Sequence, residues 1–294
     1  MTKELLSQRK VNSFSSPTSS IECQNTNHSI SLFDRISVHQ ITTYHWSLKE
    51  SLLGLCSTGI PAIGLWNRKI LDVEPDLAAE LIIDSKLKVS TISLAGGFTG
   101  GNEYSFKEAI SDAIEIIKFG GQVNAAAVQV VSGPRAGHTR NHAKQLTIDA
   151  LKQLGDVAAL HGTKLALKSM PLSLGKNWTF LNSLDSVLET IEACNHPAVG
   201  IAIDSTQICH ENNVQDLVSE IIPMITAVQI SGFTPGKTPQ QSFSNFDLIE
   251  AIDHAGYDGF FDLEIWSEQV WHSDYLSLLS QLQLACQTEL SSEF

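Results

Sequence analysis

The sequence predicts a single closed (β/α)8 barrel, an α/β fold in which eight parallel strands alternate with eight helices. From Arg35 onward, short β-branched or apolar runs alternate eight times with longer amphipathic stretches, which is typical of repeated βα units around a parallel sheet. These units occupy about 260 residues, close to the ~250 residues that such a barrel needs. The 294-residue chain is 43% hydrophobic, which is enough for one large core.

The predicted strands are the eight short runs of β-branched and apolar residues. They fall at regular intervals along the chain, with one amphipathic segment between each pair. In chain order they are Ile36–Ile41, Ala62–Trp66, Val89–Leu94, Ala126–Val131, Lys164–Lys168, Val199–Asp204, Ile225–Ile230 and Phe260–Ile265.

The predicted helices are amphipathic segments with recognisable starts and ends. A capping residue or an acidic first turn introduces each of them, as in the segment 47–50 with sequence SLKE. Several end at a glycine, such as Gly59 or Gly162, because a left-handed C-cap needs a residue without Cβ. In chain order the helices are Ser47–Ser57, Asp76–Lys86, Phe106–Lys118, Asn141–His161, Ser183–Ala193, Val214–Ile222, Phe246–His254 and Asp274–Ala285.

Residues 1–33 have a different composition from the rest of the chain. They include eight serines, six of which lie in the segment 7–20, and they lack the apolar surface that would offset the entropy of ordering. We predict a disordered serine-rich leader over 1–33 and the barrel over 34–294. The leader has no continuous apolar stretch of a signal peptide, and no run of about 20 apolar residues occurs anywhere. We therefore expect a cytoplasmic protein without a membrane partner.

The charge distribution narrows the classes of partner. Residues 201–294 carry 14 acids and one base, Lys237, whereas residues 1–200 carry 18 of each, so the last third holds the whole net charge of −13. An acidic surface repels a phosphate backbone, so we exclude nucleic acid and disfavour a strongly anionic substrate. The common nucleotide-binding glycine motifs are absent, and the five cysteines show no zinc-binding spacing.

Polar residues that close the predicted strands form the candidate site. In a (β/α)8 barrel the reactive side chains project from the C-terminal ends of the strands. Charged residues within the runs 165–168 and 262–265 would be costly to bury unless they were paired, so we expect pairing across the barrel mouth. The candidates, in chain order, are His39, Trp66, Arg68, Gln129, Lys168, Asp204, Gln207, Gln229, Glu264 and Trp266.

Four segments carry a resemblance to a known family. They are Trp46–Glu50, Cys56–Trp66, Gly256–Gly259 and Leu263–Glu268, with sequences WSLKE, CSTGIPAIGLW, GYDG and LEIWSE. Together they resemble the sugar phosphate isomerase/epimerase family, whose members have a xylose isomerase-like barrel, over residues 35–286. The resemblance implies an enzyme that interconverts sugars or polyols by moving protons on carbons next to a carbonyl, often with a divalent metal.

The resemblance also implies which residues stand at the strand ends. Its pattern has a glutamate ending the fifth strand, an aspartate ending the sixth with a histidine three residues later, a histidine on the seventh and a glutamate ending the eighth. Asp204 and Glu264 match, whereas Lys168, Gln207 and Gln229 do not. The four central positions then carry a formal charge of −1 instead of −3. An ammonium group replaces a carboxylate ligand and an amide replaces an imidazole, so we predict no tightly bound divalent metal and no other cofactor.

Lys168, Asp204 and Glu264 are therefore the predicted catalytic residues. Lys168 would supply a fixed positive charge between the two carboxylates. In a metal-free isomerase or epimerase acting on a small-molecule sugar or polyol, Lys168 would polarise the carbonyl and Glu264 would abstract the proton. The main alternative is an inactive barrel that binds a polyol or another protein.

Two further alternatives stay open at this stage. Lys168 could act as a Schiff-base nucleophile, although two nearby carboxylates favour its protonated form. A metal site could also be rearranged around other residues, for which the candidates are His138, His142 and His210.

The remaining candidates are predicted to bind substrate. Trp66, Trp266 and Trp271 would stack against the C–H face of a sugar, and His39 would contact a hydroxyl. Arg68 is the candidate for binding an anion. Because Lys237 is the only base in the last third, we expect an unphosphorylated substrate. Gln207 and Gln229, the two glutamines at the positions of the family's histidines, are also predicted to bind substrate.

Overall fold

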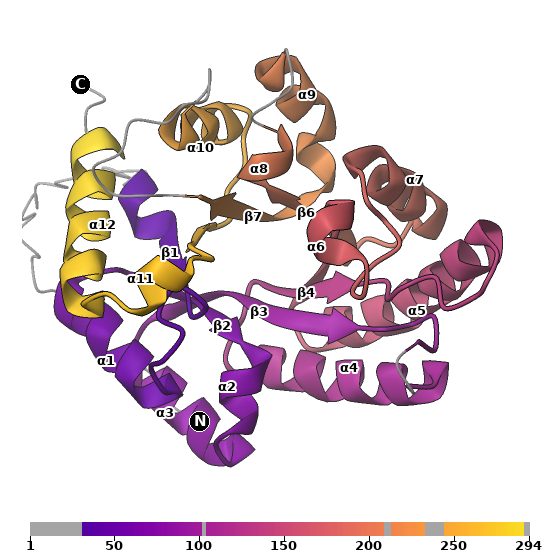
Figure 1. Cartoon of the computed structure of the whole chain (residues 1–294), viewed down its shortest axis with the longest axis horizontal. Coiled ribbons are helices and arrows are strands. Elements are labelled where there is room, and N and C mark those ends of the chain that lie inside the picture. The colour runs from indigo at the N-terminus through magenta and orange to yellow at the C-terminus, as the bar shows by residue number, and fades with distance from the viewer. Residues whose placement is uncertain (1–30, 102–103, 209–212, 233–243, 291–294) are drawn as a thin grey trace, which may run out of the picture. The chain divides into compact units, whose positions relative to one another are not determined.

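The computed structural model describes residues 31–101, 104–208, 213–232 and 244–290. Eight parallel strands form one closed barrel in chain order, ringed by helices, as Figure 1 shows. This confirms the (β/α)8 fold. The strands are β1 (Ile36–His39), β2 (Ala62–Trp66), β3 (Lys88–Gly96), β4 (Ala127–Val131), β5 (Lys164–Lys168), β6 (Val199–Asp204), β7 (Ile225–Ser231) and β8 (Phe261–Glu264).

Helices follow the strands and cover the outside of the barrel (Figure 1). The eight predicted helices are all present, and the sequence analysis missed the short ones because four or five residues show no helical periodicity. The helices are α1 (Leu48–Thr58), α2 (Asn67–Leu71), α3 (Pro75–Ser85), α4 (Phe106–Gln122), α5 (Arg140–Leu160), α6 (Leu172–Gly175), α7 (Leu184–Cys194), α8 (Ser205–Ile208), α9 (Val214–Ile221), α10 (Asn245–His254), α11 (Glu268–Trp271) and α12 (Tyr275–Leu290).

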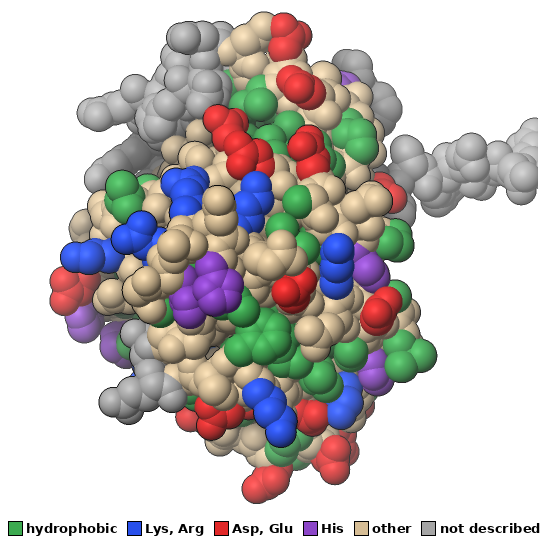
Figure 2. Space-filling model, turned by 90° about the vertical axis from the view of Figure 1, so that its right-hand side faces the viewer, with side chains coloured by type: hydrophobic (Ala, Val, Ile, Leu, Met, Phe, Trp, Pro, Cys, Tyr) green, Lys and Arg blue, Asp and Glu red, His purple; other side chains and the backbone are tan. Residues whose placement is uncertain are grey.

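Local sequence sets the starts of several helices. Ser47 caps α1 and Glu50 completes a reciprocal capping box, and Ser105 with Glu108 does the same for α4. Pro75 begins α3, where a missing N–H has no cost. The apolar faces of the helices pack on the outer faces of the strands in one large core. The outer surface carries mixed charge, as Figure 2 shows for the side with α5 and α7.

The inside of the barrel is built in layers. Ala127, Ala166, Ala202 and Ala227 form a buried cluster of small side chains, one from each of β4 to β7. Side chains on a strand alternate between its two faces, so the residues two positions further on also point inward. These are the residues at the C-terminal ends of the strands: Gln129, Lys168, Asp204 and Gln229. The fold therefore places the candidate site directly above the alanine layer.

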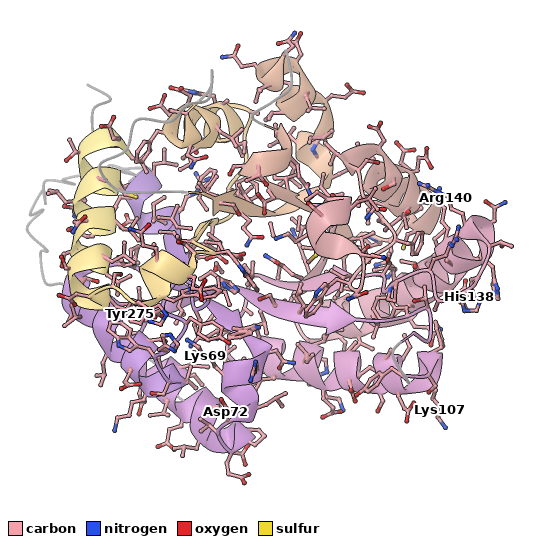
Figure 3. The ribbon with its side chains drawn as sticks, viewed as in Figure 1. Lys69, Asp72, Lys107, His138, Arg140 and Tyr275 are labelled. Atoms are coloured by element: carbon pink, nitrogen blue, oxygen red, sulfur yellow. The ribbon has the colours of Figure 1, made fainter. Side chains whose placement is uncertain are left out.

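The first strand ends two residues earlier than predicted. The chain turns after His39, because the backbone N–H of Thr42 donates to the His39 carbonyl. The buried ammonium of Lys69 holds this turn by donating to the carbonyl oxygens of Gln40, at 3.0 Å, and Thr43, at 2.7 Å. Burial lowers the pKa of Lys69 to about 8. Figure 3 labels Lys69, which lies on α2.

The described chain begins at Ser31. Leu32–Arg35 forms a short 3-10 helix, and Leu32 and Phe33 pack against the core, so packing begins before the predicted boundary at residue 34. The rest of the predicted leader, residues 1–30, lies outside the described residues. Among the helices that the structure describes, none combines the length and the apolar character needed to cross a bilayer.

Candidate functional site

Four consecutive strands bring together the polar cluster at the barrel mouth. Lys168 ends β5, Asp204 ends β6, Gln229 lies near the end of β7 and Glu264 ends β8. The Lys168 Nζ lies 3.3 Å from Asp204 Oδ2, and it donates a hydrogen bond to Gln229 Oε1. The side chains of Lys168 and Asp204 are each 10% exposed. The predicted catalytic residues therefore share one nearly buried site.

Asp204 is a fully hydrogen-bonded carboxylate. Its Oδ1 accepts from the backbone N–H of Thr206 at 3.0 Å and from the Thr206 hydroxyl at 2.7 Å. Its Oδ2 accepts from the Ser231 hydroxyl at 3.0 Å, in addition to facing Lys168. These three hydrogen bonds fix the carboxylate in place. Asp204 is therefore equipped to hold the Lys168 ammonium beside it.

Glu264 has the opposite environment. No side chain or backbone donor of the described residues bonds its carboxylate, and its side chain is 18% exposed. Burial raises the pKa of Glu264, the Lys168 ammonium opposes this rise, and the Asp204 carboxylate adds to it. A carboxyl group with a raised pKa exchanges a proton near neutral pH more readily than an ordinary one. The two acids at the mouth therefore differ: hydrogen bonds hold the Asp204 carboxylate, whereas the Glu264 carboxylate has no such bond and a raised pKa.

His39 is a neutral imidazole fixed on both sides. Its Nδ1 accepts from the backbone N–H of Ile41 at 3.2 Å, so its Nε2 carries the proton and donates to the Ser93 hydroxyl at 2.8 Å. Nδ1 also lies 3.7 Å from Glu264 Oε2, but a neutral ring makes no ion pair there. Burial lowers the pKa of His39 to about 4, Asp262 acts against this shift, and Lys168 reinforces it. Both nitrogens are engaged within the protein, which leaves neither free for a sugar hydroxyl.

The His39 assignment makes a direct prediction for nuclear magnetic resonance. The ring nitrogens of His39 should keep the shifts of a neutral, Nε2-protonated imidazole as the pH falls from 7, with protonation only near pH 4. Since unfolded histidine titrates near pH 6.5, His39 should cost folding stability as the pH falls from about 6.5 toward that lower value. Nitrogen-15 correlation spectra of the wild type and of His39→Gln identify the signal. A His39 titration near pH 6.5 would contradict the assignment.

The sequence analysis did not identify Asp262 as part of this interior. It lies on β8 two residues before Glu264 and is fully buried. Its carboxylate accepts from the Ser37 hydroxyl at 2.5 Å and from the Thr91 hydroxyl at 2.9 Å. Burial raises the pKa of Asp262, and His39 acts against that rise. Gly64 provides the space, because a Cβ there would lie 2.2 Å from Asp262 Oδ2. Strand alternation was the signal that could have found this residue.

Two buried amide nitrogens near the mouth have no partner. The Nε2 atoms of Gln129 and Gln229 are inaccessible to solvent, and no hydrogen bond reaches either of them in the structure. Buried donors are normally satisfied, so these two nitrogens and the Nε2 of Gln40, which is also buried without a partner, are exceptions within the described residues. Gln129 was a strand-end candidate without an assigned role. Gln207, by contrast, is occupied with Ser169, since its amide donates to the Ser169 carbonyl and accepts from the Ser169 hydroxyl, both at 3.0 Å.

The predicted aromatic residues lie at the edge of the mouth. Trp266 is 69% exposed and lies 5.5 Å, ring to ring, from Trp271. Trp271 stacks on Tyr44 at 4.5 Å, and Tyr44 lies 5.6 Å from Trp66. The Arg68 guanidinium lies 5.7 Å from the centre of the Trp66 ring. The structure thus joins Trp66, Trp266 and Trp271, the three predicted tryptophans, through Tyr44, which the sequence analysis did not connect with them.

The residues at the mouth do not fit a divalent cation. The Lys168 ammonium faces Asp204 at 3.3 Å, where a metal would need that oxygen. Within the part of the chain that the structure describes, no three His, Cys, Asp or Glu side chains are grouped to hold a metal ion. His138 and His142 lie 4.6 Å apart, ring to ring, and His138 Nε2 bonds the Thr99 carbonyl at 2.9 Å. His210 lies outside the described residues.

Two cavities lie outside the Lys168 cluster. One, of about 210 Å³, is lined by the segment 94–97, by Tyr104 and by Trp178. The other, of about 400 Å³, lies between the segment after β4 and the segment after β5. Neither is lined by Lys168, Asp204 or Glu264. Glu264 is more exposed than the other two charged residues of the cluster, at 18% against 10% for Lys168 and for Asp204.

Comparisons with known proteins agree with this architecture. In solved structures, the chain is similar to protein SMc04130 from Sinorhizobium meliloti 1021, with a TM-score of 0.73 at 19% identity over 85% of this chain and 97% of that one. It is also similar to an L-ribulose 3-epimerase, with a TM-score of 0.72 at 17% identity over 88% of this chain and 95% of that one. For 3-keto-D-glucoside 4-epimerase from E. coli the TM-score is 0.69 at 16% identity, over 85% of this chain and 97% of that one.

These identities are too low to show more than the shared fold. No curated protein sequence matches the chain. The family model for the xylose isomerase-like TIM barrel does match, over residues 57–283, which is most of the chain. The chain therefore belongs to the xylose isomerase-like TIM barrel family.

Proposed function

We propose that the protein is an isomerase or epimerase of a small sugar or polyol that moves a proton on a carbon next to a carbonyl without a divalent metal at the barrel mouth. The observation that carries this proposal is the contrast between the two acids. Both oxygens of Asp204 accept hydrogen bonds beside Lys168, whereas Glu264 is partly buried and unbonded, and its pKa is raised. Carboxyl groups held in such different environments are typical of acid–base sites.

The proposed proton transfer uses three groups of this chain. The Glu264 carboxylate takes the proton from the carbon next to the carbonyl, and the electron pair of that C–H bond moves toward the carbonyl oxygen. The Lys168 ammonium stabilises the negative charge that develops on this oxygen. The Gln229 side-chain oxygen accepts a hydrogen bond from the same ammonium and so helps to position it. Glu264 then returns the proton to the same carbon or to the former carbonyl carbon. In the second case the hydroxyl proton of the first carbon passes to the former carbonyl oxygen, so that the two carbons exchange carbonyl and hydroxyl groups.

The single free base favours isomerisation over epimerisation. A transfer between adjacent carbons on one face of the substrate needs one carboxylate, whereas inversion with two bases needs an acid–base group on each face. Asp204 is saturated and Lys168 stands where the family pattern has its other glutamate, so Glu264 is the one unbonded acid among the four described cluster residues. We therefore favour interconversion of an aldose and a ketose.

A panel of sugars and polyols tests this function in deuterated water. For a ligand that raises the melting temperature, the wild type should exchange the substrate C–H for deuterium. Glu264→Gln should lower this exchange by about 10²- to 10⁴-fold while ligand binding persists, because general base catalysis contributes about that much. Glu268→Gln, an exposed acid four residues away in α11, is the matched control. Exchange by Glu264→Gln at the rate of the control would contradict the proposal.

A catalytically inactive binding barrel is the second candidate. The observation in its favour is that Lys168 donates a hydrogen bond to Gln229 and pairs with Asp204 within the protein, with little exposure to solvent. In the same experiment this candidate predicts a ligand that stabilises the wild type without any exchange. Such a result would replace the first proposal with the second.

A further inference from the structure

A second site lies on the rim of the barrel, away from the Lys168 cluster. The cavity of about 400 Å³ lies between the segment after β4 and the segment after β5, and three cationic side chains line it. They are Arg135, Arg140 and Lys176. Figure 3 labels Arg140 and His138 at the right-hand edge of the barrel, and Figure 2 shows Lys and Arg side chains gathered beside histidines on that side.

The three cations have no anionic partner in the described residues. The ion pairs of lysine and arginine there use Arg35, Lys118, Lys144 and Lys168, and no hydrogen bond from the side chains of Arg135, Arg140 or Lys176 occurs. The chain has a net charge of −13, so three cations without acidic partners around one cavity are unusual for this protein. Their mutual repulsion is a cost that a bound anion would relieve.

The start of α5 adds positive potential to the same cavity. Arg140 is the first residue of this 21-residue helix, whose first turn contains no acidic residue. The Thr139 hydroxyl accepts from the backbone N–H of His142, which leaves the N–H groups of Arg140 and Asn141 without an acceptor inside the helix. A helix N-terminus carries a partial positive charge of about +0.5. Side chains and backbone therefore favour the same ligand charge.

We propose that this cavity binds a phosphate group. Two guanidinium groups and one ammonium match the oxygens of a phosphate, since arginine binds such groups through paired N–H donors. The cavity wall also includes Leu172 and Phe180, which offer apolar surface to the organic part of a phosphate monoester. This inference does not rest on the proposed function. It departs from the expectation of an unphosphorylated ligand, which was based on the last third of the chain, whereas these cations lie in the middle third.

The site sits close in sequence to the end of β5. The Nδ2 of Asn182, which lines the cavity, donates to the carbonyl of Met170 at 3.1 Å, two residues after Lys168. The phosphate group could therefore belong to the substrate at the barrel mouth or to a separate ligand. Inorganic phosphate, a hexose phosphate and the parent hexose distinguish these sources.

Calorimetric titration of the purified protein with inorganic phosphate, at ionic strength held constant with chloride, tests the site. The wild type should bind phosphate, and the double variant Arg135→Gln with Arg140→Gln should weaken the binding at least about tenfold, since hydrogen bonds to charged groups are among the stronger ones. Lys176→Gln should weaken it by a smaller factor. Lys107→Gln, an exposed cation of α4 that does not line this cavity, is the control and should leave the affinity unchanged.

The outcomes separate cleanly. Tighter binding of the hexose phosphate than of both phosphate and hexose would place the group on the ligand of the barrel mouth, and equal binding of phosphate and hexose phosphate would indicate a separate anion site. Equal weakening by Lys107→Gln, or no binding of phosphate beyond that of chloride, would overturn the proposal. The positions are exposed, so unchanged circular dichroism and melting temperature of the unliganded variants exclude misfolding as the cause.

Discussion

Replacing Lys168 with methionine should lower the free energy of unfolding at pH 7 by about 3–5 kcal/mol, the cost of breaking a buried ion pair by removing one partner. The methionine keeps the length of the side chain and removes the charge that faces Asp204 at 3.3 Å. Asp204 and Glu264 would then share the mouth without a compensating cation, and the Gln229 carbonyl oxygen would lose its donor. Urea unfolding of the wild type and the variant measures the difference.

The pH dependence of this deficit identifies its origin. Lys168 now lowers the pKa of Glu264 against the effect of burial, so its removal should raise that pKa further. A carboxyl group with a raised pKa in the folded state contributes stability at low pH that is lost as the pH rises. The deficit of Lys168→Met should therefore shrink as the pH falls from 7 toward 4. Lys164→Met, at the exposed start of the same strand, should cost little at any pH, and an equal deficit in this control would refute the explanation.

Converting the cluster to the family's pattern should create a metal site. The double variant Lys168→Glu with Gln229→His would place a carboxylate and an imidazole beside Asp204 and Glu264, a donor set suited to Mn²⁺ or Zn²⁺. We expect its affinity for these ions to exceed that of the wild type at least about a hundredfold, since even outer partners of ligands contribute 10- to 100-fold. Titration calorimetry of the purified proteins measures the gain.

Two matched variants show whether a gain in metal affinity comes from the new side chains at positions 168 and 229. Lys168→Glu alone should bind these ions less tightly than the double variant, because it lacks the imidazole. Lys164→Glu adds the same carboxylate at the exposed start of β5, far from the strand's C-terminal end, and should show no gain. If the double variant bound metal no better than Lys164→Glu, the residue correspondence between this chain and the family's pattern would be wrong.

Periodicity and composition predicted the barrel well because eight parallel strands need eight apolar runs. Ala62–Trp66, Lys164–Lys168 and Val199–Asp204 were predicted with their observed bounds, since polar or turn residues end each run. Other bounds depend on contacts from distant parts of the chain. The first strand stops at His39, where Lys69 holds a turn that the local sequence does not specify. Hydrogen bonding across the sheet extends β3 beyond the predicted Leu94 to Gly96.

The candidate site was predictable to the extent that it follows from strand ends. The rule that reactive groups close the strands selected Lys168, Asp204 and Glu264, and the structure brings them to one mouth. It could not separate the two acids, because hydrogen bonds from Thr206 and Ser231 determine that Asp204 is saturated. Such differences depend on which side chains from other strands lie nearby, and strand order alone does not fix their rotamers.

The metal content of the wild-type protein tests the central claim most directly. The protein is purified without chelator, incubated with excess Mn²⁺, Zn²⁺ or Mg²⁺, dialysed and measured by mass spectrometry of the elements. Since an ammonium group already faces Asp204, we expect far less than one ion per chain, with no difference between the wild type and Asp204→Asn. One ion per chain in the wild type that is lost in Asp204→Asn would show that the mouth holds a metal and would contradict the account.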